Sequence, residues 1–397
     1  MKILFLTSRV PFPLDKGDKV RAYHQLEELS KHHQICLFSL NDQELHPAAL
    51  PALEKLCSEV VVVNLSKAAL FFNLLRTAFG PLPMQVGYFY NSRTLARFQK
   101  VVADFKPDAV YCQLIRTAEY ARKLDVPKVL DYMDVFSKGI ERRIPKVPFF
   151  QRPLFRMEYR RLVRYEKEVF ADFDNLTIIS RQDRDLIPHP ERNAIHVIPN
   201  GVDLNFFHPL NGASSEKEHK AFGILFNGNM SYPQNIESAV YLVEEIMPAV
   251  WKKYPDIRVL ISGTTPSQRV KELASDKVTV SGWVDDIREN FSKSFMLVAP
   301  MQTSIGLQNK LMEAMAMQLP CVTSTLANNA LGAKDGEEIL IANEPKEYAQ
   351  AIFRLLEDNA FSAGIASRGY AFVKHHYSWV QAGEQLNQLF VHPPEVI

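Results

Sequence analysis

The stretch Lys2-Ile3-Leu4-Phe5-Leu6-Thr7 decides the fold class, because it is a short apolar run without polar alternation. Such a run predicts a strand that is buried on both faces. A loop rich in proline and aspartate follows at residues 10–18, and the apolar spacing from Val20 to Leu29 predicts an amphipathic helix. Residues 35–40 form a second apolar run. A strand, a helix and a second buried strand in this order indicate a parallel sheet.

The same alternation continues through the first half of the chain and begins again in the second half. Further strands are predicted at residues 60–63, 109–112, 128–132, 176–179 and 196–198, and then at residues 223–226, 258–262, 278–280, 295–299 and 321–323. Between the two series, residues 206–220 have turn composition followed by a charged run, which is typical of a linker. We therefore expect an α/β protein with two doubly wound, Rossmann-like domains that face each other across a cleft.

Composition excludes several classes of protein. The 397 residues carry 46 Lys+Arg against 45 Asp+Glu, and this balance argues against nucleic acid as a partner. Cys36, Cys57, Cys112 and Cys321 show no CxxC spacing, so neither a zinc site nor a disulfide framework is indicated. The N-terminus lacks the long apolar stretch of a signal peptide, and no 18-residue apolar run exists. We expect a cytoplasmic protein.

Missing motifs narrow the chemistry further. No GxGxxG follows the first predicted strand, and the chain contains no GxxxxGK[ST], GxSxG or HExxH motif. These absences argue against a dinucleotide oxidoreductase, a P-loop enzyme, an α/β-hydrolase and a zinc protease.

The segment from Ala299 to Pro320 carries the most chemical information. It predicts a strand end, a loop and a helix that Ser304 caps and Pro320 ends. At 100° per residue, Gly306, Asn309, Lys310 and Glu313 share one face. A helix N-terminus with a close glycine and a lysine suits a diphosphate, and a carboxylate one turn deeper can accept hydrogen bonds from two ribose hydroxyls. The alternative is a plain amphipathic helix with a Lys–Glu pair three residues apart, and spacing alone favours it.

This segment resembles the G-x-x-x-K-x-x-E-A-M-A-like helix of the retaining, GT-B-type glycosyltransferases of family 4 (glycosyl transferases group 1). Four other segments resemble motifs of that family in the same order: residues 198–209, 228–235, 280–286 and 377–379. The resemblance implies an N-terminal acceptor-side domain at residues 1–205, a linker at 206–220, a nucleotide-sugar-binding domain at 221–365, and a C-terminal helix at 366–397 that packs back on the first domain.

The resemblance also implies a hexosyltransferase that moves a sugar from a nucleotide sugar to a saccharide or lipid-linked acceptor with retention, in polysaccharide or cell-envelope glycan synthesis. It implies no cofactor and no metal. The catalytic candidates are Asp134, Lys310 and Glu313. The donor-binding candidates are Gly17, Gly228, Asn229, Gly282, Trp283, Val284, Ile305, Gly306, Leu307, Asn309, Lys310 and Glu313.

Several candidates also have a purely structural explanation. Gly17 is equally explained as a turn glycine, and Asp134 and its competitor Asp131 as caps after a strand. Arg181 is a further candidate at the end of the strand at 176–179.

Two features depart from the family pattern. Many members carry two glutamates eight positions apart, but Ile305 stands where the first would be, and the loop at residues 227–236 lacks the usual Arg and Lys. Lys310 and the amides of Gly306 and Leu307 would then carry more of the phosphate charge. The missing carboxylate at Ile305 keeps open a catalytically silent sugar-nucleotide-binding subunit. A sugar-nucleotide epimerase, which uses the same two-domain scaffold, is the other alternative.

One region favours contact with a membrane surface. Residues 138–164 hold nine basic residues against Glu141 and Glu158, with aromatic residues between them, and residues 68–76 are strongly apolar. This composition suits an anionic lipid or a lipid-diphosphate acceptor, which would place the protein peripherally on the inner membrane face. A solvated helix face over core aromatics explains the pattern equally well.

Overall fold

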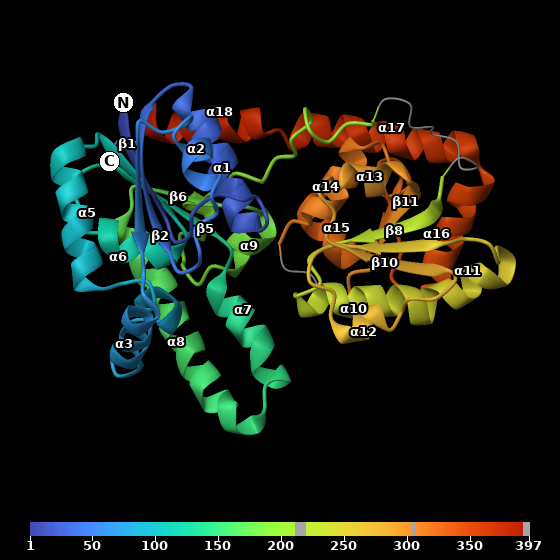
Figure 1. Cartoon of the computed structure of the whole chain (residues 1–397), viewed down its shortest axis with the longest axis horizontal. Helices are drawn as coiled ribbons and strands as arrows, with labels where there is room; N and C mark the ends of the chain where they lie inside the picture. Colours follow the sequence, from blue (N-terminus) through green and yellow to red (C-terminus); the bar gives the residue numbers. More distant parts are fainter. Residues whose placement is uncertain (211–219, 304–305, 392–397) are drawn as a thin grey trace. The chain divides into compact units, whose positions relative to one another are not determined.

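The computed structural model describes residues 1–210, 220–303 and 306–391. The chain forms two compact units, one of residues 1–199 with 379–397 and one of residues 200–378. Figure 1 shows a parallel sheet with helices around it in each unit. No helix among these residues is long and apolar enough to cross a bilayer.

Unit 1 is built on a seven-stranded parallel sheet in the order β3-β2-β1-β4-β5-β6-β7. Its strands are β1 (Lys2–Thr7), β2 (Gln34–Asn41), β3 (Glu59–Asn64), β4 (Ala109–Gln113), β5 (Lys128–Met133), β6 (Asn175–Ile178) and β7 (His196–Val197). The order reverses between β1 and β4, which pair Ile3 with Ala109 and Leu6 with Cys112. In open parallel sheets, ligands bind beyond the carboxyl ends of the strands at such a reversal.

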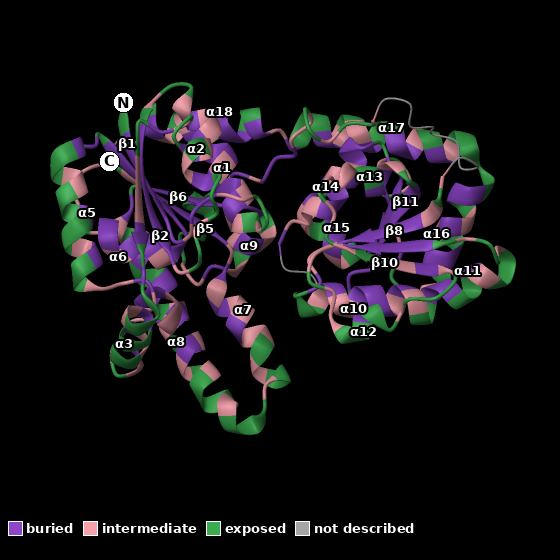
Figure 2. Cartoon of the chain, in the orientation of Figure 1, coloured by how far each residue is buried: buried purple, intermediate pink, exposed green. Residues whose placement is uncertain are grey.

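The helices of unit 1 cover the sheet and also extend from it. They are α1 (Gly17–Ser30), α2 (Ala49–Leu53), α3 (Lys67–Ala78), α4 (Met84–Gly87), α5 (Ser92–Phe105), α6 (Ala118–Ala121), α7 (Phe136–Arg143), α8 (Arg152–Glu168), α9 (Arg181–Leu186) and α18 (Trp379–Val391). Short 3₁₀ turns join them: η1 (Ile115–Thr117), η2 (Ile144–Lys146), η3 (Phe149–Gln151), η4 (Val169–Asp172) and η5 (Arg192–Ala194). In Figure 2 the strands are mostly buried, whereas the ends of α3 and of the α7–α8 hairpin are mostly exposed.

Unit 2 has a six-stranded parallel sheet in the order β10-β9-β8-β11-β12-β13. The strands are β8 (Phe222–Asn227), β9 (Val259–Ser262), β10 (Val278–Gly282), β11 (Ser294–Ala299), β12 (Cys321–Thr323) and β13 (Leu340–Ile341). The helices are α10 (Pro233–Tyr241), a π-helical turn η7 (Leu242–Ile246), α11 (Met247–Lys253), α12 (Gln268–Lys271), α13 (Arg288–Ser292), α14 (Asn309–Ala316), α15 (Thr325–Leu331), α16 (Pro345–Glu357) and α17 (Asn359–His376). Here the strand order reverses between β8 and β11.

The predicted strands agree with the structure to within a residue or two, and among the described residues β13 is the one strand that the pattern missed. The helix expected up to Pro320 is shorter: α14 begins at Asn309, with Gln308 at its N-cap, and ends at Ala316 because Gln318 adopts a left-handed conformation. Ser304, the expected cap, lies outside the described residues.

The chain returns to unit 1 at Trp379 rather than at residue 366. Residue 366 lies inside α17, whose neighbour is α14 of unit 2, and the helix ends only at His376. After this break α18 packs along α1. Trp379 stacks on His24 with ring centroids 4.7 Å apart. Gly383 is required there, because a Cβ at that position would lie 2.3 Å from Cβ of Glu28.

Candidate functional site

The carboxyl ends of β8 and β11 frame the candidate site in unit 2. In open parallel sheets, ligands bind next to such a reversal of strand order, and the loop after β11 leads into α14. Gly306, in that loop, is buried and has a φ of 67°, which favours glycine over residues with a Cβ. Leu307 and Asn309 are half-buried. The first backbone N–H groups of α14 therefore begin next to a glycine turn at the edge of the sheet.

Lys310 occupies the centre of this site. Its side chain is buried, and Nζ donates a hydrogen bond to Oδ1 of Asn235 at 2.6 Å. The same Nζ lies 4.7 Å from the centroid of the Phe226 ring and 3.8 Å from the sulfur of Met301. One amide oxygen and an aromatic face are modest compensation for an ammonium group taken out of water. Burial accordingly lowers the pKa of Lys310 to about 7, opposed by the charge of Glu313.

Glu313 lies one turn further along α14 and is half-buried. Burial raises the pKa of its carboxyl group to about 7, opposed by the charge of Lys310. Lys310 and Glu313 thus influence each other, because the charge of each favours the charged form of the other. A ligand that brought negative charge to Lys310 would favour the protonated ammonium, and a ligand that donated hydrogen bonds to Glu313 would favour the carboxylate.

Glycines allow the backbone to approach Lys310 and Asn235 closely. An added Cβ on Gly228 would lie 2.9 Å from Nδ2 of Asn235 and 3.0 Å from Nζ of Lys310. Gly263, with a φ of 140°, leaves no room either, since its Cβ would lie 1.7 Å from the carbonyl oxygen of Gly228. The N–H of Gly263 donates to the carbonyl of Gly282 at 3.1 Å. The carboxyl ends of β8, β9 and β10 are therefore joined through three glycines.

Asn235 holds the loop and the lysine together. Its Nδ2 donates to the carbonyl of Asn229 at 2.8 Å while its Oδ1 accepts from Lys310. Asn229 in turn accepts hydrogen bonds at Oδ1 from the N–H and hydroxyl of Ser231. Sequence reasoning did not assign Asn235 or Gly263 to the site, because their roles depend on contacts with strands and helices far along the chain. The local signal for Asn235 was the resemblance of residues 228–235 to a motif of the glycosyltransferase family.

The remaining donor-binding candidates of unit 2 differ in exposure. Gly282 has a φ of 68° at the end of β10, and Trp283 next to it is 65% exposed. Val284 is half-buried. Ile305 lies outside the described residues. The Oδ1 atom of Asn309 is buried and has no hydrogen-bond partner in the part of the chain that the structure describes, so α14 begins with an acceptor available for a ligand.

In unit 1 the two competing aspartates are clearly distinguished. Asp131 is fully buried, and Arg21 donates to both of its oxygens at 2.6 and 3.1 Å. The hydroxyls of Tyr111 and Thr177 donate to it as well, each at 2.9 Å. A carboxylate so fully satisfied holds α1, β4, β5 and β6 together and has little capacity left for chemistry.

Asp134 has a different environment. It is half-buried beyond the end of β5, and burial raises its pKa to about 7, reinforced by the carboxylates of Asp183, Asp131 and Asp18. Asp134 does not cap the helix that follows, which was its alternative role, because Val135 is the N-cap residue of α7 and makes no side-chain hydrogen bond there. Gly17 is the first residue of α1, exposed, and a Cβ there would touch only Cε of Met133 at 3.8 Å. Arg181 is exposed at the start of α9.

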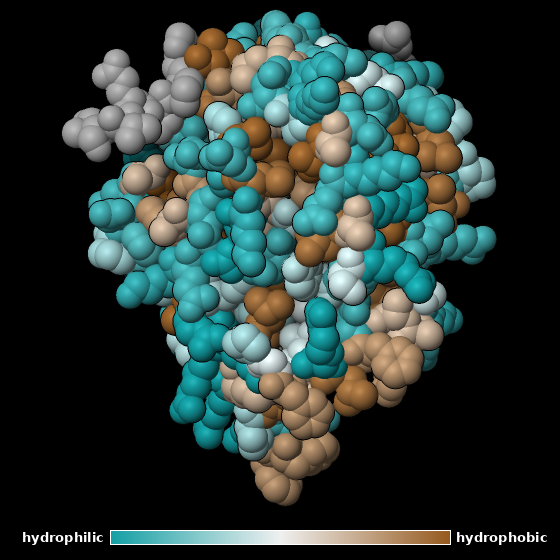
Figure 3. Space-filling view, turned by 90° about the vertical axis from the view of Figure 1, so that its left-hand side faces the viewer, coloured by the Kyte–Doolittle hydropathy of each residue, from teal (hydrophilic) through white to brown (hydrophobic). Residues whose placement is uncertain are grey.

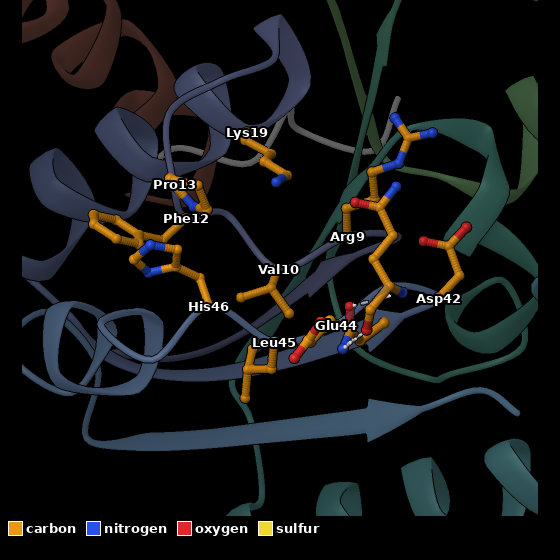
Figure 4. Close-up of a pocket in the computed structure, with 11 residues that line it drawn as sticks. Arg9, Val10, Phe12, Pro13, Lys19, Asp42, Glu44, Leu45 and His46 are labelled. Carbon is orange, nitrogen blue, oxygen red and sulfur yellow. Dashed lines mark hydrogen bonds between the residues drawn. The ribbon is translucent and has the colours of Figure 1, made fainter. Parts of the chain in front are cut away.

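A polar pocket lies in unit 1, beyond the carboxyl ends of β1 and β2. It is lined by Arg9, Val10, Phe12, Pro13, Lys19, Asn41, Asp42, Gln43, Glu44, Leu45 and His46. Figure 4 shows Lys19 and Arg9 on the opposite side of it from Leu45 and Glu44. Arg9 pairs with Asp18 at 2.8 Å and Lys19 with Asp15 at 2.9 Å. Such a mixture of charges and amides suits hydroxyl-rich molecules, which both donate and accept hydrogen bonds.

Two glycosyltransferase family models match the chain, one in each half. Residues 221–358 match the family described as "Glycosyl transferases group 1", and residues 17–206 match "Glycosyltransferase Family 4". An uncharacterized 44.6 kDa protein in the cps region of Klebsiella pneumoniae is 22% identical over 95% of this chain and 96% of its own length. Phosphatidyl-myo-inositol mannosyltransferase of Mycolicibacterium smegmatis is 27% identical over 49% of this chain and 50% of its own.

Solved structures share the fold. Sucrose-phosphate synthase from Thermosynechococcus elongatus superposes with a TM-score of 0.70 at 17% identity, over 98% of both chains. HepE from Anabaena, solved in complex with UDP-glucose, has a TM-score of 0.70 at 14% identity, over 98% of this chain and 99% of its own. These likenesses confirm the expectation of two Rossmann-like domains of the GT-B type.

Proposed function

The chain belongs to the group 1, family 4 glycosyltransferases, and from that premise we propose that it transfers a hexose from a nucleoside-diphosphate sugar to a saccharide or lipid-linked acceptor with retention. The observation that carries the proposal is the buried Lys310–Asn235 pair at the N-terminus of α14, beside the Gly228 turn. An anion is the ligand that such a buried ammonium next to the N-terminus of a helix would bind best. We assign the donor diphosphate to this position and the ribose to Glu313.

The proposed reaction breaks the bond between the anomeric carbon and the diphosphate oxygen. Negative charge then develops on the leaving diphosphate, where Lys310 and the first amides of α14 stabilise it. The acceptor hydroxyl oxygen bonds to the anomeric carbon on the face from which the diphosphate leaves. Its proton passes to an oxygen of the leaving phosphate. Gly228 allows the phosphate to approach the backbone, because no Cβ stands between it and Lys310.

We place the acceptor side of the reaction in unit 1. The polar pocket beyond β1 and β2 offers donors and acceptors for sugar hydroxyls, and Asp134 is the group proposed to contact the reacting sugar. The proposal includes no metal and no cofactor. The proposed setting is polysaccharide or cell-envelope glycan synthesis in the cytoplasm.

A nucleotide-release assay tests the proposal. The protein is incubated with UDP-, GDP- and ADP-hexoses, with and without saccharide and lipid extracts, and released nucleoside diphosphate is measured. A transferase releases it with acceptor. An epimerase interconverts the sugar while the nucleotide stays attached, and a silent subunit binds the donor without turnover. The anomeric configuration of the product, read by NMR, decides retention.

Lys310→Met is the matching variant, because its straight apolar chain fills the same buried space. We expect the rate to fall about 10²-fold or more, as when an enzyme loses one preorganised charge-stabilising donor. Lys293→Met, on an exposed lysine of the same unit, is the control and should retain activity. Equal rates in Lys310→Met and wild type would refute the assignment of the donor diphosphate to this position.

A further inference from the structure

Unit 1 exposes large apolar side chains on α3 and on the segment formed by η3 and α8. Phe79 is 88% exposed and Phe149 is 80% exposed, values far above those of an ordinary surface aromatic. We use the name apolar surface for the set Phe71, Phe72, Leu75 and Phe79 on and just after α3, together with Phe149, Phe150 and Leu154 on η3 and α8. Large apolar side chains exposed in such number mark a site of interaction.

The apolar surface on α3 lies on one face of the helix. At 100° per residue, Phe71, Phe72 and Leu75 fall within one arc of the helix, and Phe79 just beyond its end continues that arc. The buried residues Leu70, Asn73 and Thr77 lie on the opposite side, toward the sheet. The inward face of α3 is therefore packed against unit 1, whereas its outward face is apolar and stays exposed when unit 1 folds.

Side-chain to backbone bonds hold α3 and α8 together. Arg161 donates from Nη1 to the carbonyl of Thr77 and from Nη2 to that of Ala78, each at 3.0 Å. Arg164 donates to the carbonyl of Pro81 at 3.0 Å. Figure 1 shows α3 and the α7–α8 hairpin extending together from the lower end of unit 1. In Figure 3 apolar side chains gather at the lower end of the molecule, at the height of these elements.

Positive charge surrounds the apolar surface. Residues 66–80 contain no acidic side chain. In residues 136–164 the two carboxylates point elsewhere: Glu158 is buried and accepts from the N–H groups of Met84 and Gln85, and Glu141 pairs with Lys138 at 2.8 Å. The exposed basic residues of these segments are Lys67, Arg76, Arg143, Lys146, Arg152, Arg156, Arg160 and Arg164.

We propose that the apolar surface docks on an anionic phospholipid bilayer, with its phenylalanines in the boundary between headgroups and acyl chains and the surrounding Arg and Lys on lipid phosphates. Two features favour a bilayer over a protein partner. The exposed aromatic side chains lie on elements that extend from unit 1 (Figure 1), and the exposed charges of these elements are mostly basic, with Glu141 paired to Lys138 and Glu168 to Arg164. Aromatic residues with interleaved basic residues are the composition that binds anionic lipid surfaces. This inference is independent of the donor site.

Sedimentation with lipid vesicles tests the proposal on the full chain, without donor or acceptor. The vesicles contain phosphatidylcholine alone or with about one third phosphatidylglycerol. We expect binding to the anionic vesicles that weakens with salt, as screening requires. Phe72→Ser/Phe79→Ser and Arg156→Gln/Arg160→Gln should each reduce the bound fraction about tenfold. The controls are Val380→Ser, an exposed apolar residue on α18, and Arg97→Gln/Lys100→Gln, exposed basic residues on α5.

A tryptophan at position 79 reports insertion directly. In Phe79→Trp, we expect emission to shift to shorter wavelength on addition of anionic vesicles and to be quenched by brominated acyl chains, relative to wild type. Absence of binding to anionic vesicles at low salt would overturn the proposal. Binding that Phe72→Ser/Phe79→Ser leaves unchanged would also overturn it. So would a concentration-dependent dimer that these serine variants abolish, because the surface would then join two copies of the chain.

Discussion

The ammonium of Lys310 donates a hydrogen bond to Oδ1 of Asn235 across 2.6 Å, and the same asparagine donates to the carbonyl of Asn229 across 2.8 Å. One side chain at the start of α10 thereby sets both the position of the lysine and the path of the loop after β8. An amide can do this without neutralising the ammonium, so the positive charge remains available to an incoming anion.

Replacing Asn235 by aspartate tests this relationship. The carboxylate would pair with Lys310, raise its pKa and compete with the donor diphosphate for the ammonium. We expect donor binding to weaken about tenfold or more, which corresponds to about 1.4 kcal/mol, measured by calorimetric titration with the best nucleotide sugar. Gln234→Ala, at the preceding position on the same helix, is the control and should bind like wild type. Unchanged binding by Asn235→Asp would mean that the diphosphate lies elsewhere.

Gly228→Ala places a methyl group 2.9 Å from Nδ2 of Asn235 and 3.0 Å from Nζ of Lys310. Overpacking of this kind should cost about 1–3 kcal/mol in the free energy of unfolding and should weaken donor binding, because Lys310 must move. Urea denaturation measures the first effect. Gly139→Ala is the matched control: a Cβ there meets nothing within 4 Å in the helix α7, so this change should stabilise the protein by about 0.4–1 kcal/mol.

Donor binding should depend on pH with a maximum near neutrality. Burial lowers the pKa of Lys310 to about 7, so the ammonium loses its proton as pH rises through this value. Burial raises the pKa of Glu313 to about 7, so the carboxylate that accepts from ribose hydroxyls is lost as pH falls through the same range. The affinity should therefore decrease on both sides. Lys310→Gln should bind the donor more weakly at every pH and should no longer lose affinity as pH rises. If the affinity of this variant still decreases at alkaline pH, another group causes that decrease.

Asp134→Asn should change stability in a pH-dependent direction. The pKa of Asp134 is raised to about 7 in the folded chain, so the folded state binds more protons than the unfolded state between about pH 4 and 7. The stability contributed by this group is therefore present below pH 4 and lost as pH rises through 7. We expect the asparagine variant to melt at a higher temperature than wild type at pH 8 and at a similar temperature at pH 4. A lower melting temperature of the variant than of wild type at pH 8 would contradict the raised pKa of Asp134.

Asp131→Ala should be strongly destabilising, in contrast to Asp134→Asn. It leaves the guanidinium of Arg21 buried without the carboxylate that neutralises it. Removing one partner of a buried ion pair costs about 3–5 kcal/mol, which urea denaturation will measure. Glu289→Gln removes the partner of Lys293 in an exposed pair and should change stability by less than about 0.5 kcal/mol. A small loss in Asp131→Ala would show that the pair is not structural.

The sequence predicted much of this arrangement from local patterns. Apolar runs such as Lys2–Thr7 predicted strands because strands buried on both faces need no polar residues. The spacing of Lys310 and Glu313 placed them on one side of a helix. The tail was expected to be helical, but the pattern did not predict that it divides into α17 and α18 at Tyr377. The division depends on tertiary packing, because α17 packs on α14 and α18 packs on α1.

By itself, then, the sequence determined the two series of alternating strands and helices and the helix that carries Lys310 and Glu313, because periodicity acts between neighbouring residues. Only the tertiary structure decided which groups surround them. It separated Asp131, saturated by Arg21, Tyr111 and Thr177, from the half-buried Asp134. It also brought Asn235 to Lys310 over 75 positions of sequence. Burial and hydrogen-bond partners depend on how strands and helices distant in the chain pack, and no local pattern records that packing.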